Sequence, residues 1–268
     1  MRATLPAIRR SKRQKDRTVA ARETKARQPD TSAAAHVGAA PSLSVAVHDR
    51  MRANILAGRF DPGSRLSPRE LATEFEVSLS VVREALSRLA EQGLVVATPQ
   101  LGFSVVSLDV DDLVDLTKVR VLIEGAALRQ AVEHTDIEYE TRVVAAHHRL
   151  TRTPFLADEA SKTITDEWAA AHAAFHNALI SASPSFRLRD LSANLRDHSE
   201  LYRRWSGPFA AGNKRRDVEG EHRSMMQAVL DHDADRAVEL LADHINLTTS
   251  ILISFATSCG VANSEASA

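Results

Sequence analysis

The sequence predicts a mainly α-helical protein that combines an N-terminal winged helix-turn-helix with a C-terminal all-α bundle. Three observations support this fold class. Apolar residues recur at helical spacing over residues 77–89, directly after a segment with helix-capping and turn residues. Two β-rich runs follow, at 94–96 and 103–106. From residue 109 to residue 255 the pattern is helical with short breaks, and no strand signal recurs.

The first domain is predicted to contain two helices joined by a tight turn. Residues 67–70, Ser-Pro-Arg-Glu, form a capping box with proline at the first helical position, so a helix begins there and runs to Phe75. A turn at 76–79 leads to the second helix, which Ser78 or Ser80 caps. This pair is a helix-turn-helix, and its second helix is typical of a DNA recognition helix.

A first helix and a wing complete this domain. We expect the first helix at 43–57. Gly93 ends the recognition helix, because glycine accepts the left-handed conformation that often follows a helix. The two β-rich runs then form a two-stranded wing, joined by a turn that contains Pro99 and Gly102.

The first domain resembles the winged helix of GntR-type bacterial transcription regulators over residues 43 to 107. The matching segments are 55–66, 69–72, 82–86 and 93–94. The resemblance implies a partner, double-stranded operator DNA. Two positions depart from the family pattern: Leu79 stands where arginine usually follows the turn serine, and Leu101 stands where the wing tip usually has a basic residue. We therefore expect an operator that differs from the common family sequence.

The predicted DNA contacts lie on the helix-turn-helix. They are Arg69, Ser78, Ser80 and Arg83. The guanidinium of Arg83 can bond O6 and N7 of guanine together, and the two serines are expected on phosphates. The alternative for Arg83 is a surface ion pair with Glu84 or Glu91.

Length and composition limit the possible function classes. The chain has 268 residues, 44% of them hydrophobic, which suffices for two domains with a core each. Its single cysteine, Cys259, excludes a disulfide framework and a cysteine-rich zinc site. No apolar run is long enough to span a bilayer, and the N-terminus lacks the apolar core of a secretory signal. We expect a cytoplasmic, nucleoid-associated protein with no membrane partner.

The net charge of −1 hides a basic N-terminal segment. Residues 1–27 carry ten lysines or arginines and two acids, a balance of +8, so the rest of the chain stands at −9. A basic segment without apolar periodicity cannot offset its ordering entropy, so we expect a disordered basic tail and linker over 1–42. Two interpretations stay open: the tail adds salt-sensitive phosphate contacts, or it is an idiosyncratic extension or a misassigned start.

The predicted domains are a winged helix at 43–108, a helical domain at 109–256 and a C-terminal tail at 257–268. Helices of the second domain are expected near 110–133, 136–151, 158–181, 185–206, 214–231 and 233–256.

Four histidines of the helical domain are predicted to face its interior. Helical spacing places His172 and His176 on one apolar face, and His222 and His244 on the apolar faces of two later helices. An unpaired buried polar group costs about 1 to 3 kcal/mol, and a divalent metal would satisfy all four rings together. The alternative is that each ring bonds a carbonyl. The neighbouring pair at 147 and 148 is expected at the surface.

The helical domain resembles the FCD effector domain of one large GntR branch. The matching segments are 174–179, 221–223 and 242–245. The resemblance implies a six- or seven-helix bundle that holds a metal with three histidines and an aspartate four residues before the first. Here the three are His176, His222 and His244, and the aspartate's place is taken by His172. An all-imidazole set suits a divalent transition metal, Zn²⁺ or Ni²⁺, rather than Mg²⁺ or Ca²⁺.

We expect the metal to hold an effector and not to catalyse a reaction. There is no HExxH motif or similar arrangement, and Glu221 is expected to point elsewhere on its helix. Related domains use the exposed metal positions to hold a small carboxylate or sugar acid. The expected effector contacts are Arg120, His198, Arg204 and Trp205. An ion pair between Arg120 and Glu124 is an open alternative.

The expected function is a metabolite-responsive, homodimeric repressor of transcription. Two winged helices would occupy the half-sites of a near-palindromic operator. An anion at the metal would shift their relative placement and change operator affinity. Two alternatives remain: a DNA-binding regulator whose metal is purely structural, and a metal-dependent hydrolase or lyase.

Overall fold

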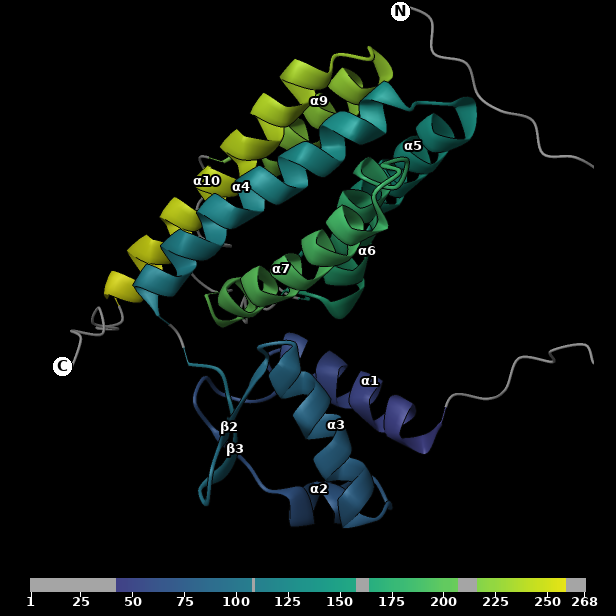
Figure 1. The fold of residues 1–268 in the computed structure, drawn as a ribbon. Helices are drawn as coiled ribbons and strands as arrows, with labels where there is room; N and C mark the ends of the chain where they lie inside the picture. Colours follow the sequence, from purple (N-terminus) through teal and green to yellow (C-terminus); the bar gives the residue numbers. More distant parts are fainter. Residues whose placement is uncertain (1–41, 108, 158–163, 207–215, 259–268) are drawn as a thin grey trace, which may run out of the picture. The chain divides into compact units, whose positions relative to one another are not determined.

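The computed structural model describes residues 42–107, 109–157, 164–206 and 216–258 (Figure 1). Its fold is mainly helical with one small sheet, as predicted. The elements are α1 (Leu43–Leu56), β1 (Arg65–Leu66), α2 (Pro68–Glu74), α3 (Leu79–Glu91), β2 (Val95–Thr98), β3 (Gly102–Val105), α4 (Val110–Glu133), α5 (Ile137–Arg152), α6 (Asp166–Leu179), α7 (Phe186–Trp205), α9 (Val218–Leu230) and α10 (Ala234–Ser258).

Helices α2 and α3 form the predicted helix-turn-helix. The Ser67 side chain caps α2 by accepting a hydrogen bond from the backbone N–H of Glu70 at 3.4 Å. Ser78 is the N-cap of α3, and Gly93, with φ +73°, follows its C-cap. The buried side chains of α3 are the apolar ones that recur at helical spacing in the sequence, and Leu86 is among those that are fully buried.

The wing contains a strand that the sequence prediction missed. β3 lies in the middle of an antiparallel sheet of order β1-β3-β2, in which Val95 pairs with Val105 and Leu66 pairs with Phe103. The two-stranded wing of the prediction is therefore incomplete. β1 has only two residues, too few for an alternating pattern, so only its pairing with β3 identifies it as a strand.

Helices α4 to α10 build the second part of the fold, in which α4 packs along α10 (Figure 1). Side-chain caps start most of these helices; Asp109 and Asp136, for example, accept backbone N–H groups at the first turns of α4 and α5. The core is centred on large buried residues such as Tyr139 and Phe175. None of the described helices has the length and apolar character needed to cross a membrane.

Two predicted features of this part are corrected. The helix expected near 158–181 begins only at Asp166, because Ile164 bridges to Leu156 and Thr165 caps α6 by accepting the N–H of Trp168. Residues 158–163 of that prediction lie outside the described residues. His147, expected at the surface, is buried and meets the ring of Phe175 edge-on at 5.6 Å.

Candidate functional site

Four histidines from three helices converge in the interior of the bundle. His172 and His176 come from α6, His222 from α9 and His244 from α10. One ring nitrogen from each lies within 4.8 Å of the others. His172 and His176 lie on the same face of α6, because residues four apart in a helix lie one above the other. The cluster has the donor set and the spacing of a metal site.

The histidine nitrogens are poorly supplied with hydrogen-bond partners. Both ring nitrogens of His176 and Nε2 of His222 are buried without a partner among the described residues. Burial holds the pKa of His172, His176 and His222 well below the ordinary value. The rings are therefore neutral at neutral pH and keep a lone pair, which is the form that binds a metal. Neutral, clustered imidazoles, two of them with unpaired ring nitrogens, fit a borderline divalent ion.

Glu221 departs from the sequence expectation. It was expected to point elsewhere on its helix, but its Oε2 lies 2.7 Å from Nδ1 of His244. Arg216 donates to both carboxylate oxygens, at 2.8 and 2.7 Å. Burial would raise the pKa of Glu221, but the hydrogen bonds from Arg216 and His244 outweigh it and hold the pKa at about 2. Glu221 is thus ionised and in hydrogen-bond contact with His244, one of the four clustered histidines.

A cavity of about 880 Å³ opens beside the histidine cluster. All four histidines line it, together with apolar side chains such as Phe155, Trp168 and Ile245. The arginines of its lining are Arg52, Arg59, Arg120, Arg196, Arg203, Arg204 and Arg216. The acids of the lining are Asp166, Asp197, Glu200 and Glu219. The lining therefore has more positive than negative side chains, which favours an anionic ligand.

A buried charge group lies at one wall of this cavity. Glu124, only 1% exposed, accepts from Nε of Arg120 at 2.7 Å and from Nη1 of Arg196 at 2.9 Å. Arg120 also donates to the hydroxyl of Ser199, and Arg196 donates to the side chain of Asn177. The ion pair that was open for Arg120 is formed, and Arg120 lines the cavity as well. One carboxylate faces two guanidinium groups, so one positive charge is left over.

Arg203 was not identified from the sequence. Its guanidinium lies 4.9 Å from the Trp168 ring centre and forms an ion pair with Glu200. Its Nη1 is buried and has no hydrogen-bond partner among the described residues. The sequence does contain a signal that could have identified it: Arg203 lies seven residues after Arg196 and hence on the same face of α7. Its free N–H group marks a place where a ligand oxygen would fit.

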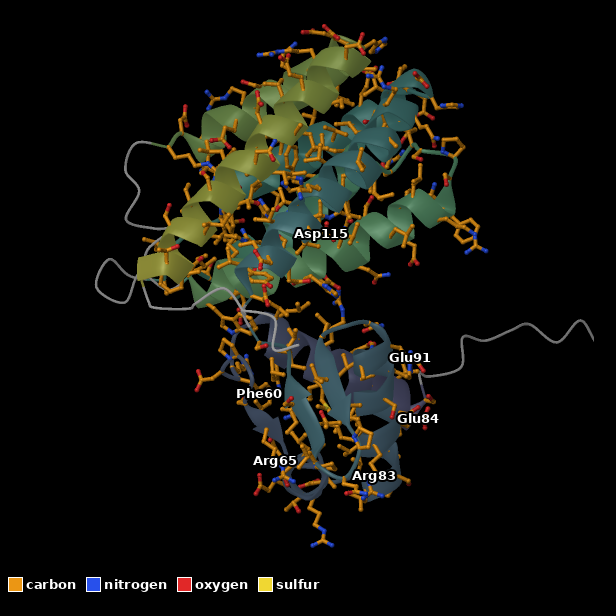
Figure 2. All side chains as sticks on the ribbon, turned by 60° about the vertical axis from the view of Figure 1, so that its left-hand side comes forward. Phe60, Arg65, Arg83, Glu84, Glu91 and Asp115 are labelled. Atoms are coloured by element: carbon orange, nitrogen blue, oxygen red, sulfur yellow. The ribbon has the colours of Figure 1, made fainter. Side chains whose placement is uncertain are left out.

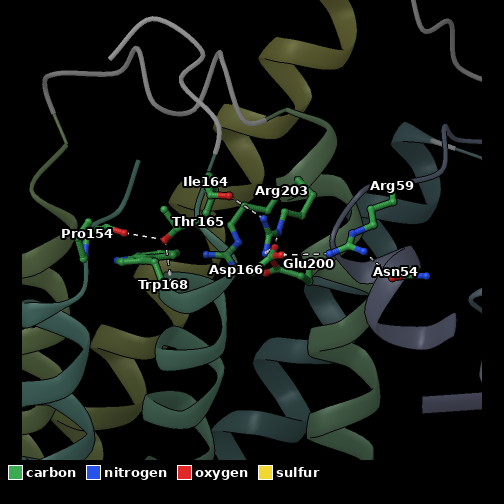
Figure 3. A network of polar contacts seen from close by, with 10 residues as sticks. Asn54, Arg59, Pro154, Ile164, Thr165, Asp166, Trp168, Glu200 and Arg203 are labelled. Carbon is green, nitrogen blue, oxygen red and sulfur yellow. Dashed lines mark hydrogen bonds and ion pairs between the residues drawn. The ribbon is translucent and has the colours of Figure 1, made fainter. Parts of the chain in front are cut away.

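Arg204 takes part in a polar network at the start of α6 and the end of α7. Figure 3 labels its partners Ile164, Asp166 and Glu200. Its guanidinium donates to Asp166 and to the carbonyl of Ile164, each at 2.8 Å, and to Glu200 at 3.0 Å. Arg59, which follows α1, reaches Asp166 at 3.8 Å. Arg204 therefore lines the cavity with its donors already used inside the protein.

His198 and Trp205 lie outside the described cavity lining. Nε2 of His198 is 2.6 Å from the carbonyl oxygen of Gln92, the C-cap residue of α3. The indole N–H of Trp205 donates to the carbonyl of Phe60 at 3.4 Å. The structure thus places these two predicted effector contacts against the winged helix.

The four predicted DNA contacts are exposed. Arg69, Ser78, Ser80 and Arg83 lie at or near the N-terminal turns of α2 and α3. The hydroxyls of Ser78 and Ser80 are 2.9 Å apart, and neither caps α3 through its side chain. In the described part of the chain Arg83 has no ion pair with Glu84 or Glu91; Figure 2 shows Arg83 toward the same end of the domain as Arg65 and Glu91 toward the other. Arg83 is thus available to a ligand.

Two family models match separate parts of the chain. Residues 43–105 match the family described as bacterial regulatory proteins, gntR family, and residues 115–247 match the FCD domain. The uncharacterized HTH-type transcriptional regulator BphR of Paraburkholderia xenovorans is 39% identical over 220 residues, which cover 80% of this chain and 86% of BphR. The HTH-type transcriptional repressor GlaR of Escherichia coli is 29% identical over 197 residues, covering 73% of this chain and 89% of GlaR.

Solved structures share the fold. Escherichia coli McbR/YncC has a TM-score of 0.68 at 20% identity, covering 80% of this chain and 98% of that chain. A putative transcriptional regulator GntR from Rhodococcus sp. RHA1 has a TM-score of 0.64 at 22% identity, covering 79% of this chain and 97% of that chain.

Proposed function

This chain belongs to the GntR family of bacterial regulatory proteins and carries an FCD domain, and we propose that it is a repressor controlled by a small acid bound at a metal ion. It is a DNA-binding transcriptional regulator with an effector-binding domain, and not an enzyme. The proposal assigns residues 43–108 to DNA binding and residues 109–256 to the sensing of metal and effector.

The observation that carries the proposal is the histidine cluster at the cavity wall. His172, His176, His222 and His244 would hold the ion. The buried nitrogens without partners support this, because leaving such a group unpaired costs about 1 to 3 kcal/mol each. Four imidazoles and no carboxylate in the ligand set favour Zn²⁺ or Ni²⁺. The ion would supply a positive centre to which an anion can bind.

The effector of the proposal is a small organic acid or sugar acid. A carboxylate at the metal would be close to the positive side of the lining, where Glu124 balances only one of two arginines. Arg203 offers a free buried N–H group, and charge-assisted hydrogen bonds of this kind are short and strong. Arg120 and Arg204 are further positive side chains at the proposed effector site; Arg204 would act through its charge, because its donors are used inside the protein.

On DNA, the protein would act as a homodimer. Two copies of the winged helix match the half-sites of a near-palindromic operator. Arg83 and Arg69 would read bases, and Ser78 and Ser80, at the positive N-terminus of α3, would bind phosphates. The name of the relative GlaR, a transcriptional repressor, supports repression.

The experiment is a thermal-shift screen of organic and sugar acids against the full chain, with Zn²⁺ or Ni²⁺ and after chelation. We expect acids to stabilise the protein only with metal present. His176→Ala should lose both the metal and the response to acids, while operator-independent DNA binding remains. The matched control is His232→Ala, because His232 is exposed and pairs with Glu140 away from the cluster.

Two results would contradict the proposal. A His176→Ala variant that responds fully to the acids would show that the cavity site is wrongly assigned. Metal binding without any response to acids would favour the alternative, a purely structural metal, since a closed structural site is insensitive to small anions.

A further inference from the structure

Glu221 lies directly behind one histidine of the cluster. We propose that it is a positioning residue that fixes which nitrogen His244 presents to the metal and supplies the negative charge that the four imidazoles lack. This inference rests on the proposed metal site. It concerns a residue that does not contact the ion itself.

The geometry determines the tautomer of His244. Nδ1 of His244 lies 2.7 Å from Oε2 of Glu221. Because an ionised carboxylate only accepts hydrogen bonds, Nδ1 must carry the proton and donate it. Nε2 is then deprotonated and keeps its lone pair. The opposite tautomer would place two lone-pair atoms 2.7 Å apart and leave His244 unable to ligate through Nε2. Nη2 of Arg216 also lies near Nδ1, but at 3.3 Å this contact is longer and weaker than the one to the carboxylate, which therefore decides the tautomer.

The carboxylate is held in place by Arg216. The guanidinium donates to both oxygens of Glu221, and its Nη2 lies 3.3 Å from the carbonyl oxygen of His244. This arrangement connects Arg216, two residues before the start of α9, to α10. Glu221 therefore cannot rotate away from His244 without breaking its two-point ion pair with Arg216. This ion pair fixes the position of the oxygen that accepts from His244.

The negative charge of Glu221 matters in this chain because none of the four clustered side chains supplies one. The four clustered ligands are all neutral imidazoles. In the described part of the chain, no other carboxylate is hydrogen-bonded to any of the four rings. A carboxylate that accepts the second N–H of a metal-bound histidine raises the basicity of that ligand, and removing it typically weakens metal binding about 10- to 100-fold.

The test measures the metal affinity of the full chain by competition with a chromophoric chelator, using Zn²⁺. We expect Glu221→Gln, which keeps the shape but removes the charge, to bind Zn²⁺ about tenfold more weakly, and Glu221→Leu about 100-fold more weakly. Glu239→Gln is the matched control, since Glu239 is an exposed α10 residue that pairs with Arg236. Circular dichroism checks that each variant is folded, and the glutamine variant carries the test where the leucine variant does not fold.

A second readout separates positioning from a merely structural role. Long-range ¹H–¹⁵N spectra of the metal-free protein report the tautomer of each histidine, and the His244 signal is assigned by its loss in His244→Asn. We expect the Nδ1–H form in the natural protein and a shift toward the Nε2–H form in Glu221→Leu.

The outcomes distinguish this inference from the proposed function. If the natural protein binds no Zn²⁺ at micromolar concentration, the metal site fails and the inference fails with it. If the natural protein binds Zn²⁺ and both glutamate variants bind it equally well, the metal site stands and the role of Glu221 is overturned. An unchanged His244 tautomer in the leucine variant would also overturn it.

Discussion

Arg203 is the residue whose contacts support an anionic ligand most directly. Its Nη1 is buried and unpaired among the described residues, although its neighbour Glu200 takes another of its hydrogens. A guanidinium group placed in this way gains a full charge-assisted hydrogen bond when a carboxylate enters the cavity. The face that Trp168 presents to Arg203 holds the group in place.

We predict that Arg203→Gln weakens binding of the stabilising acids about tenfold or more, since hydrogen bonds to charged groups contribute about 1.5 to 3 kcal/mol. Zn²⁺ affinity should be unchanged, because Arg203 is not a ligand of the proposed ion. Isothermal titration calorimetry measures both. Arg187→Gln is the control on the same helix, where the exposed Arg187 lies over the exposed Phe186 ring. Equal acid affinity in the two variants would argue against a role for Arg203.

Arg83 is the residue on which sequence reading of DNA is predicted to depend. We expect Arg83→Lys to cost about 1 to 3 kcal/mol on an operator selected from random DNA, because lysine cannot form the two-point contact with guanine. Binding to unrelated DNA should hardly change, since the positive charge is kept. Fluorescence anisotropy at a fixed salt concentration measures the difference. Arg149→Lys, on an exposed site of α5, is the control; equal losses on operator and unrelated DNA would contradict base readout.

At the scale of the element, α7 has contacts with both halves of the described chain. Arg196 and Arg203 face the cavity, while His198 bonds the C-cap carbonyl of α3 and Leu201 is buried in the core of the winged helix. Asp197 also pairs with Arg52 of α1. The same helix therefore carries residues of the proposed effector site and residues that contact the winged helix.

A substitution at Gly93 tests the contact between α7 and the winged helix. Gly93 has φ +73°, and a Cβ atom there would come within 2.6 Å of the His198 ring. We predict that Gly93→Ala lowers the free energy of unfolding by about 1 to 2 kcal/mol from the left-handed conformation, with a further loss from the clash. In a His198→Ala background the loss should be smaller, because the clash is gone and only the backbone cost remains. Urea unfolding followed by circular dichroism measures both; equal losses in the two backgrounds would contradict the clash.

At the scale of the whole molecule, the proposed metal ties three helices together. α6, α9 and α10 each contribute to the cluster, and in the described part of the chain both ring nitrogens of His176 and Nε2 of His222 have no hydrogen-bond partner, so loss of the proposed ion would leave these buried atoms unpaired. A ligand that binds only the folded state stabilises it by about 2.7 kcal/mol at a concentration 100 times its dissociation constant.

We therefore predict that chelation lowers the thermal midpoint of the natural protein and that added Zn²⁺ restores it. His222→Ala should have a low midpoint that neither chelator nor Zn²⁺ changes. Differential scanning calorimetry measures the midpoints, and His232→Ala should behave like the natural protein. An unchanged midpoint on chelation of metal-loaded protein would exclude a stabilising ion.

Much of the fold could be predicted because helix boundaries are encoded locally. The capping box at Ser67 and the bounds of α4, 110–133, follow from neighbouring residues alone. The four clustered histidines could be placed on the inward faces of their helices because helical periodicity also depends only on spacing along one segment. β1 could not be predicted, because two residues carry no periodic signal and become a strand only by pairing with β3.

The sequence by itself determined the class of protein, the helix-turn-helix and the four histidines that face inward, since each depends on spacing along one helix or on a family motif. Only the tertiary structure decided that Glu221 braces His244, that Arg203 opens onto the cavity and that His198 reaches Gln92. These are contacts between side chains of different helices. Their distances depend on how the helices pack, which the periodicity of a single helix does not specify.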